Sequence, residues 1–256
     1  MKKLIGGLCI VAVVLFSMAA KSPDKVVIAN GEWAPYFAES FEHYGVVSRV
    51  VKESFELEGV TVEYVFHPWK RGMEEAKTGK INATMGYGKK AERLEFFDYS
   101  STPIMENTNV IFHRVDKPIQ WNTVSDLAAY KLGGTVGYFY GKELEEAEKA
   151  GTIKIERGRD EKLVFKKLFA GRIDGLPSDL DAGYHIINDL LTPEEAKQLT
   201  NHSKKLDTFP CYLLLGKTRP ENKELMELFE KGFKKLRDSG KVDQYWKESR
   251  EGKYKK

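Results

Sequence analysis

The sequence has few cysteines, little net charge and few long apolar segments. It has 2 Cys among 256 residues, and 41 basic residues nearly balance 38 acidic ones, for a formal net charge of +3. A dedicated nucleic-acid-binding protein needs a basic surplus to neutralise phosphates, so we expect no nucleic-acid partner. With 41% hydrophobic residues the chain is too apolar to be disordered, and its length suffices for one large domain or two ordinary ones.

The first twenty residues have the three-part layout of a secretory signal peptide. Two lysines precede an apolar run that ends at Phe16, and small residues follow. The run is shorter than the roughly 20 residues that a membrane-spanning helix needs. The alternative to a cleaved signal peptide is an uncleaved membrane anchor. We therefore expect a signal peptide over 1–20, cleavage after Ala19 or Ala20, and a periplasmic product. Its net charge would be +1, the original +3 less the two lysines.

The motifs of the common enzyme classes are missing. No P-loop, dinucleotide-binding glycine spacing, zinc-ligand spacing or Gly-x-Ser-x-Gly elbow occurs in the sequence. Cys9 lies in the predicted signal peptide, and Cys211 lies in an apolar run that favours a buried core position over a reactive thiol. We expect no metal, no cofactor and no enzymatic activity.

The predicted secondary structure repeats one order of elements twice. Strand, helix, strand, helix and strand follow one another over residues 25–30, 45–57, 60–66, 70–78 and 81–85. The same order returns over residues 132–136, 142–150, 153–156, 161–170 and 172–176. A strand at 211–216 and a helix with an apolar face between Leu225 and Leu236 come last. Each unit is typical of a parallel sheet with right-handed crossovers.

This pattern predicts an α/β protein of two lobes. The last strand and helix can complete the first lobe if the chain crosses between lobes twice, near 105–110 and near 207–212. We therefore predict a first lobe of residues 21–107 plus 211–256, a second lobe of residues 108–210, and a hinge of two strands.

Aromatic residues gather where the predicted strands end. In open α/β sheets ligands bind beyond the carboxyl ends of the strands. The aromatic residues at these ends are Trp33, Trp69, Tyr87, Tyr138 and Tyr140. Any one of them could simply pack in the core, but the group predicts a cleft between the lobes for a small molecule.

Several motifs, taken together, resemble a known family. In order they are Asn-Gly-Glu-Trp-Ala-Pro-Tyr at 30–36, His-Pro-Trp-Lys-Arg at 67–71, Gly-Lys-Ile-Asn-Ala-Thr-Met-Gly at 79–86, Glu-Arg at 92–93, and Gly-Arg-Ile-Asp at 171–174. The set resembles the family 3 extracellular solute-binding proteins, the polar amino-acid binding components of ABC importers. The resemblance implies a type II periplasmic-binding-protein fold, a monomer that closes on a small ligand, and a membrane permease as partner.

The resemblance also implies two charged ligand contacts. Arg93 stands where the family has an arginine that pairs with the carboxylate of the ligand, and Asp179 stands where an acidic residue takes its ammonium group. The alternatives are a solvated arginine and a helix N-cap. The other candidate ligand-binding residues are Trp33, Tyr36, Trp69, Arg71, Tyr87, Gly88, Tyr138 and Tyr140.

Some positions depart from the family pattern. Gly88 and Lys90 stand where hydroxyl residues are common in the family, and Lys142 follows Gly141 where the family often has threonine. The two lysines either add positive charge near an acidic ligand or face water. Arg71 either contacts the ligand or ties the lobe together.

Two other functions share this fold. A ligand sensor that signals through a membrane partner would use the same closure. A cyclohexadienyl dehydratase-like enzyme would need an acid over the leaving hydroxyl, for which Glu32 or Asp179 could serve.

Overall fold

The computed structural model describes residues 22–255, so the predicted signal peptide and Cys9 lie outside the described residues. The strands are β1 (Lys25–Asn30), β2 (Thr61–Phe66), β3 (Ala83–Tyr87), β4 (Phe97–Tyr99), β5 (Met105–Arg114), β6 (Leu132–Thr135), β7 (Ile155–Gly158), β8 (Gly175–Asp179), β9 (Leu199–Asn201) and β10 (Asp207–Gly216). The helices are α1 (Val46–Glu56), α2 (Trp69–Lys77), α3 (Lys142–Lys149), α4 (Glu161–Phe169), α5 (Leu180–Leu190), α6 (Pro193–Ala196), α7 (Asn222–Asp238) and α8 (Lys241–Arg250), with 3-10 turns η1 (Glu42–Tyr44), η2 (Ala91–Arg93) and η3 (Val124–Ala129).

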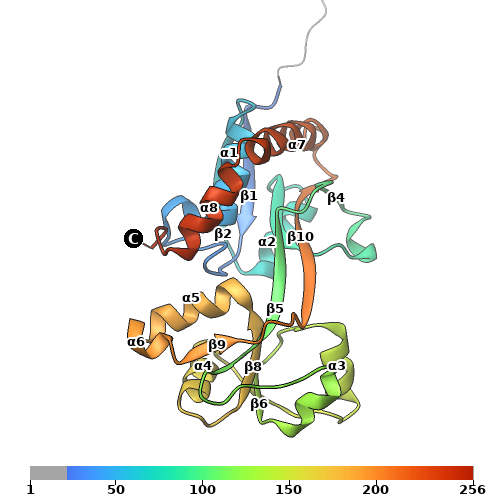
Figure 1. Ribbon diagram of the computed structural model, residues 1–256. Coiled ribbons are helices and arrows are strands. Elements are labelled where there is room, and N and C mark those ends of the chain that lie inside the picture. The colour runs from blue at the N-terminus through green and yellow to red at the C-terminus, as the bar shows by residue number, and fades with distance from the viewer. Residues whose placement is uncertain (1–21, 256) are drawn as a thin grey trace, which may run out of the picture.

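The strands form two parallel groups that are joined in the middle. Their order is β2-β1-β3-β10-β5-β8-β6-β7, with β1 parallel to β2 and β3, and β6 parallel to β7 and β8. Figure 1 shows the first lobe, with β1–β4, α1, α2, α7 and α8, above the second lobe, with β6–β9 and α3–α6. The predicted α/β fold of two lobes is confirmed.

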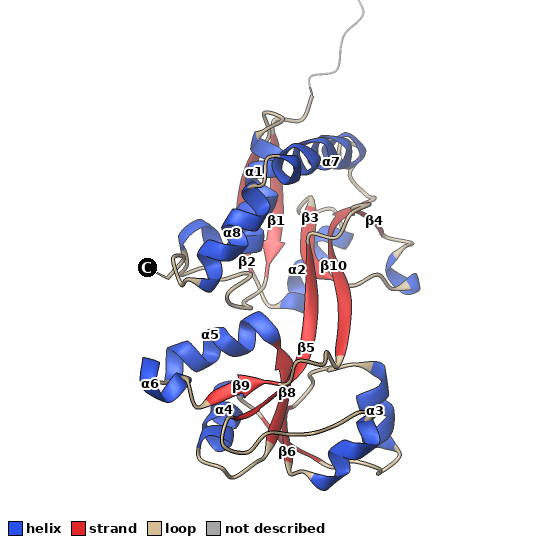
Figure 2. Ribbon diagram, viewed as in Figure 1, coloured by secondary structure: helices blue, strands red, loops and turns tan. Residues whose placement is uncertain are grey.

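Two long strands run between the lobes (Figure 2). β10 pairs antiparallel with β3 and β4 near its end, and with β5 from Asp207 opposite Asn109 to Cys211 opposite Met105. β5 then continues into the second lobe, where it pairs with β8 and β9. The pairing of β5 and β10 is the predicted double-strand connection. The lobe boundaries at 107/108 and 210/211 stay a prediction.

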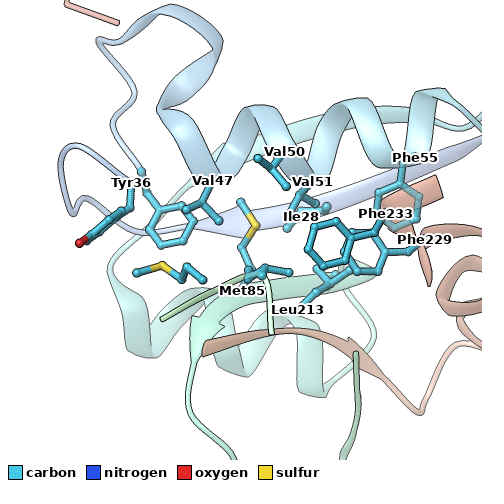
Figure 3. Close-up of a cluster of buried hydrophobic side chains, with 14 of the residues drawn as sticks. Ile28, Tyr36, Val47, Val50, Val51, Phe55, Met85, Leu213, Phe229 and Phe233 are labelled. Atoms are coloured by element: carbon cyan, nitrogen blue, oxygen red, sulfur yellow. The ribbon is translucent and has the colours of Figure 1, made fainter. Parts of the chain in front are cut away.

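The core of the first lobe lies between its sheet and the helices α1 and α7. Apolar residues recur at helical spacing in both helices, so each buries one face against the strands. Figure 3 shows this layer, in which α1 and α7 side chains meet those of β1, β3 and β10. The rings of Phe55 and Phe229 lie 5.3 Å apart, and Phe229 stacks on Phe233 at 5.4 Å. This packing holds α1 and α7 against β1, β3 and β10.

The second lobe has a core on each side of its sheet. Successive residues of a strand point to opposite faces, and β5 shows the consequence. Phe112 packs with α4 and α5 residues such as Phe165 and Ile187, whereas Ile111 packs with Leu127 and Leu144 on the other side. All six side chains are at most 1% exposed.

Three predicted strands were placed too early, and those expected over 81–85 and 153–156 are β3, Ala83–Tyr87, and β7, Ile155–Gly158. The strand expected over 172–176 is β8, Gly175–Asp179. Asp174 instead lies in a turn, where its carboxylate accepts hydrogen bonds from Lys117 Nζ and the Lys131 backbone. The short strands β4 and β9 and the helix α8 were not predicted. The prediction that Cys211 is buried is confirmed, and burial raises the pKa of its thiol to about 12.

Candidate functional site

A cavity of about 440 Å³ lies between the lobes at the carboxyl ends of their strands. This volume falls within the range of small-molecule sites, about 300–1,000 Å³. Its lining residues are Glu32, Trp33, Trp69, Gly86, Tyr87, Asn107, Asn109, Gly137, Tyr138, Phe139, Tyr140, Glu161, Asp179, Ala182 and Phe209. They come from both lobes and from both crossing strands, so a molecule held here would lie between the lobes and against the strands that connect them.

Larger hollows elsewhere have a different character. One of about 790 Å³ lies on α7 and is lined mostly by charged residues such as Glu227 and Arg237. Another of about 950 Å³ lies between α5 and the C-terminal residues. Neither lies at the carboxyl ends of the parallel strands, where open α/β sheets bind ligands. A third hollow of about 650 Å³ reaches Asp179 at the end of β8, but charged residues of α5 and α8, such as Asp181 and Arg250, make up much of its lining. We therefore take the smaller cavity, which we call the interlobe cavity, as the candidate site.

Aromatic rings form the walls of the interlobe cavity. On the first lobe, the Trp69 ring meets that of Tyr87 edge-on, with centroids 5.5 Å apart. On the second lobe, Tyr138 and Phe139 are 45% and 47% exposed, so their rings still have free surface. Tyr140 is buried, and its hydroxyl accepts a hydrogen bond from the Thr135 backbone nitrogen at 2.7 Å. The aromatic residues that the sequence placed at strand ends all line this cavity.

The indole of Trp69 is positioned by a glycine. Gly31 follows β1, and a Cβ atom there would lie 2.3 Å from Cε2 of Trp69. No side chain fits at that distance, so only glycine lets the indole lie flat against the backbone. Glycine is needed at position 31 because a side chain would take the space of the indole. The close contact links the loop after β1 to Trp69, the first residue of α2.

Asp179 ends β8 and lies between the lobes. Its Oδ1 accepts hydrogen bonds from the Ala182 backbone nitrogen at 2.9 Å and from the hydroxyl of Tyr36, and its Oδ2 accepts one from the Thr108 nitrogen at 3.2 Å. Asp179 is therefore an N-cap of α5 and also a contact to the first lobe. Burial raises its pKa to about 6 despite these bonds. Burial also raises the pKa of Tyr36, with the Asp179 carboxylate adding to the effect.

Two buried amides of β5, among the residues that line the cavity, have polar atoms without partners. Asn107 and Asn109 are each 3% exposed, and the Asn107 Oδ1 and Asn109 Nδ2 atoms have no hydrogen-bond partner in the protein. An unpaired buried polar atom costs about 1–3 kcal/mol, which a ligand with a matching donor and acceptor would offset. Both residues line the interlobe cavity two positions apart on one face of the strand.

Glu161 is a further cavity residue that the sequence reasoning missed. It is the first residue of α4 and is half-buried, and one carboxylate oxygen accepts a hydrogen bond from the Ser178 hydroxyl at 2.7 Å. Burial raises its pKa, and the nearby carboxylates of Asp179 and Asp160 raise it further. The position of Glu161, directly after the loop that ends β7, is the signal that could have identified it.

Other candidate residues lie outside the lining of the interlobe cavity. Arg93, in η2, donates from Nη1 to the Gly88 carbonyl at 3.0 Å, and its guanidinium carbon lies 5.1 Å from the centroid of the Tyr87 ring. Arg93 is therefore next to the cavity wall, behind a lining residue. Arg71 pairs with Glu75 on the same helix at 3.0 Å. Tyr36 is buried behind Asp179.

Two lysines that departed from the family pattern face water. Lys90 is exposed, and the Lys142 side chain is 82% exposed, 3.7 Å from Glu146 on the same helix. Within residues 22–255 no group of three or more His, Cys, Asp or Glu side chains is placed to hold a metal ion. None of the helices in the same range is long and apolar enough to cross a membrane.

Several solved structures have the same fold. The chain is similar to substrate-binding domain 2 of Lactococcus lactis GlnP in an open conformation, with 20% identity over 89% of this chain and 96% of the other, at a TM-score of 0.68. It is also similar to the second substrate-binding domain of a putative amino acid ABC transporter from Streptococcus pneumoniae, with 18% identity over 88% and 99% of the two chains, at 0.68. A histidine kinase sensor domain matches with 18% identity over 90% and 97%, at 0.66.

Sequence comparisons give the family directly. A search of curated protein sequences found no match to the chain. The sequence profile of bacterial extracellular solute-binding proteins, family 3, matches residues 26–248, which span both lobes, both crossing strands and the interlobe cavity. The resemblance inferred from the sequence motifs is thereby confirmed: this chain belongs to the family 3 bacterial extracellular solute-binding proteins.

Proposed function

We propose that this chain is a periplasmic protein that captures a small polar ligand, an amino acid or a related carboxylate, by closing its two lobes. It then delivers the ligand to the membrane permease of an ABC importer. The proposal requires binding and release only, with no catalysis and no cofactor. The signal peptide proposed over residues 1–20 would direct its export.

The observation that carries this proposal is the pair of unpartnered amides in the interlobe cavity. Asn107 and Asn109 lie on β5, one of the two strands that run between the lobes. A ligand that satisfies them would contact the crossing strands and the loops of both lobes together. A ligand stabilises the closed form only through contacts that the open form lacks, and contacts to both lobes meet this condition.

Two charged residues would orient an amino acid. In this proposal the Arg93 side chain turns away from the Gly88 carbonyl, to which it donates one of its five N–H groups, and binds the ligand's carboxylate. Its planar guanidinium matches the geometry of a carboxylate. Asp179 would contribute negative charge towards the ligand's ammonium group from the opposite lobe. Both residues keep their structural contacts in the unliganded protein.

The first prediction tests the role of Arg93. Purified mature protein is screened by thermal shift against amino acids and related carboxylates, where a ligand at 100 times its dissociation constant stabilises by about 2.7 kcal/mol. Arg93→Ala should abolish this stabilisation, whereas Lys90→Ala, an exposed neighbour, should keep it. The unliganded Arg93→Ala protein must still unfold cooperatively. Equal ligand responses in both variants would remove Arg93 from the site.

A sensory role is the second candidate, because the histidine kinase sensor domain shares the fold at a TM-score of 0.66. Capture and closure would be the same, and only the membrane partner would differ. Ligand uptake into vesicles containing a permease and ATPase would support import. Ligand-dependent binding to a receptor without uptake would support sensing. Turnover of prephenate or arogenate by the purified protein would contradict both and favour the dehydratase.

A further inference from the structure

The second lobe supplies three aromatic rings to the interlobe cavity from one short segment. This segment, residues 136–140, lies between β6 and α3, and we call it the aromatic loop. Its residues Tyr138, Phe139 and Tyr140 all line the cavity. Val136, Tyr138 and Phe139 are exposed, so burial in a core does not hold most of the loop. Its position must depend on other contacts.

Arg157 on β7 contacts the aromatic loop at three points. Its Nη1 donates to the carbonyl of Thr135, just before the loop, at 2.8 Å, and to the carbonyl of Tyr138 at 3.1 Å. Its guanidinium carbon lies 5.6 Å from the centroid of the Tyr140 ring, within the range of a cation–π contact. One side chain therefore holds the beginning, the middle and the end of the loop.

Arg157 is itself held in place by Glu148. Its Nε and Nη2 atoms donate to the two carboxylate oxygens of Glu148, at 3.0 and 2.6 Å. Glu148 belongs to α3, the helix that follows the loop. Paired charged groups make stronger hydrogen bonds than neutral ones, and a two-pronged pair also fixes the orientation of the guanidinium. The remaining N–H groups of Arg157 are therefore directed at the loop.

The pair of Arg157 and Glu148 acts from behind the cavity wall. Among residues 22–255, the lining of the interlobe cavity includes neither of the two. On the cavity side, the ring of Phe139 lies 6.3 Å from that of Phe209 on the crossing strand β10. A displaced loop would move Phe139 away from Phe209 and change the shape of the cavity.

We propose that Arg157 is a positioning residue for ligand capture, which holds the aromatic loop in its ligand-binding conformation before the ligand arrives. A loop that is already ordered loses less conformational freedom when a ligand binds, so the affinity is higher. This inference rests on the proposed function, since it assumes that the interlobe cavity is the capture site.

Hydrogen exchange and calorimetry on the mature protein test the two parts of the inference. In ligand-free Arg157→Gln, the backbone amides of residues 135–140 should exchange at least tenfold faster than in the wild type, whereas those of β5 should keep their rates. The probes for binding are L-glutamine, L-glutamate, L-arginine and L-lysine, and the affinity for the tightest of them should fall at least tenfold. Arg157→Lys keeps the charge without the fork, so it should show smaller changes of both kinds.

Two further variants serve as control and as reserve. Lys167→Gln removes an ion pair of 2.5 Å with Glu156, the neighbour of Arg157 on the opposite face of β7, and should alter neither the loop nor the affinity. Glu148→Gln leaves Arg157 in place but weakens its support. It should loosen the loop in the same direction, and it decides the question if the Arg157 variants fail to fold.

The outcomes separate this inference from the proposed function. Wild-type exchange of the loop in Arg157→Gln, or a faster loop with unchanged affinity, would overturn the inference and leave the proposed function intact. Equally faster exchange in β5 would also overturn it, because Arg157 would then stabilise the whole lobe rather than the loop. If the wild type binds none of the four probes and no other small carboxylate, the proposed function is rejected and the inference with it.

Discussion

Two places where the lobes meet differ in how their polar groups are satisfied. In the interlobe cavity, Asn107 and Asn109 have unpartnered atoms. At the other place, which we call the C-terminal contact, Arg250 of α8 grips Asp181 of α5 with bonds of 2.8 and 3.1 Å, and Lys255 lies 3.6 Å from Asp189. In the interlobe cavity some polar atoms lack partners, whereas at the C-terminal contact the charged groups pair with other groups of the protein.

This difference indicates which surface is available for a ligand. The C-terminal contact joins the lobes through bonds between protein groups, so a ligand there would have to replace existing bonds. In the interlobe cavity, a ligand that bonded to Asn107 Oδ1 and Asn109 Nδ2 would replace no existing bond of these atoms. Asp179 stands at the border of the two, because it lines the cavity and accepts the bond from Tyr36 across the lobes.

The largest effect should come from filling the space behind the cavity wall. In Gly31→Ala the new methyl group would meet the middle of the Trp69 ring, so the indole must move and the cavity loses its shape. Overpacking of this kind costs about 1–3 kcal/mol of stability, and we expect ligand affinity to fall at least tenfold. Urea denaturation and calorimetry would measure the two effects.

A control separates loss of stability from loss of the site. Gly59 has φ 79° with open space around it, so Gly59→Ala strains the backbone at a position remote from the cavity. It should cost about 1 kcal/mol and leave binding unchanged. If both variants bind as the wild type does, the wall formed by Trp69 does not contribute to capture.

The next effect is a pH dependence that Asp179 introduces. Burial raises its pKa from 3.8 to about 6, so the folded protein holds this proton more tightly than the unfolded chain does. This group therefore destabilises the fold as pH rises from about 4 to above 6. Relative to Asp179→Asn, the wild type should gain about 2 kcal/mol between pH 7 and pH 4. Denaturation curves of both proteins across this range give the difference.

A difference between the wild type and Asp179→Asn that stays constant over this pH range would mean that the bonds from Tyr36, Ala182 and Thr108 outweigh the burial.

The sequence could predict most of the framework because local patterns determine it. The valines of α1 recur at helical spacing, and the β-branched run of β1 ends within the predicted range. β8 was misplaced because Pro177 stands in its centre, opposite Ile111, where proline is disfavoured in a strand. Local patterns cannot show that the partner strand holds it in place.

Less of the candidate site than of the framework could be predicted from the sequence. Aromatic residues at strand ends could be found, since strand ends converge in this topology. The bond between Tyr36 and Asp179 joins residues 143 positions apart, and no local spacing encodes it. Glu161 resembles an ordinary helix-start glutamate, and Asn107 resembles an ordinary polar strand residue. The burial of both residues depends on how the two lobes meet.

The smallest effect should come from the C-terminal contact. The Arg250 side chain is 61% exposed, so its pair with Asp181 contributes only about 0.2–1 kcal/mol and weakens in salt. Arg250→Lys keeps the charge but loses the two-pronged geometry, whereas Arg250→Met loses both. A double-mutant cycle with Asp181→Asn isolates the coupling between the two side chains.

This small coupling energy is worth measuring because the pair joins the two lobes and would therefore shift the equilibrium between open and closed forms. If the pair holds unliganded lobes together, Arg250→Met should increase the radius of gyration of the ligand-free protein in X-ray scattering, while the ligand-bound curve stays the same. Arg250→Lys should fall between them. Identical ligand-free curves for all three proteins would show that the C-terminal contact follows closure without contributing to it, and would leave the interlobe cavity to set the equilibrium.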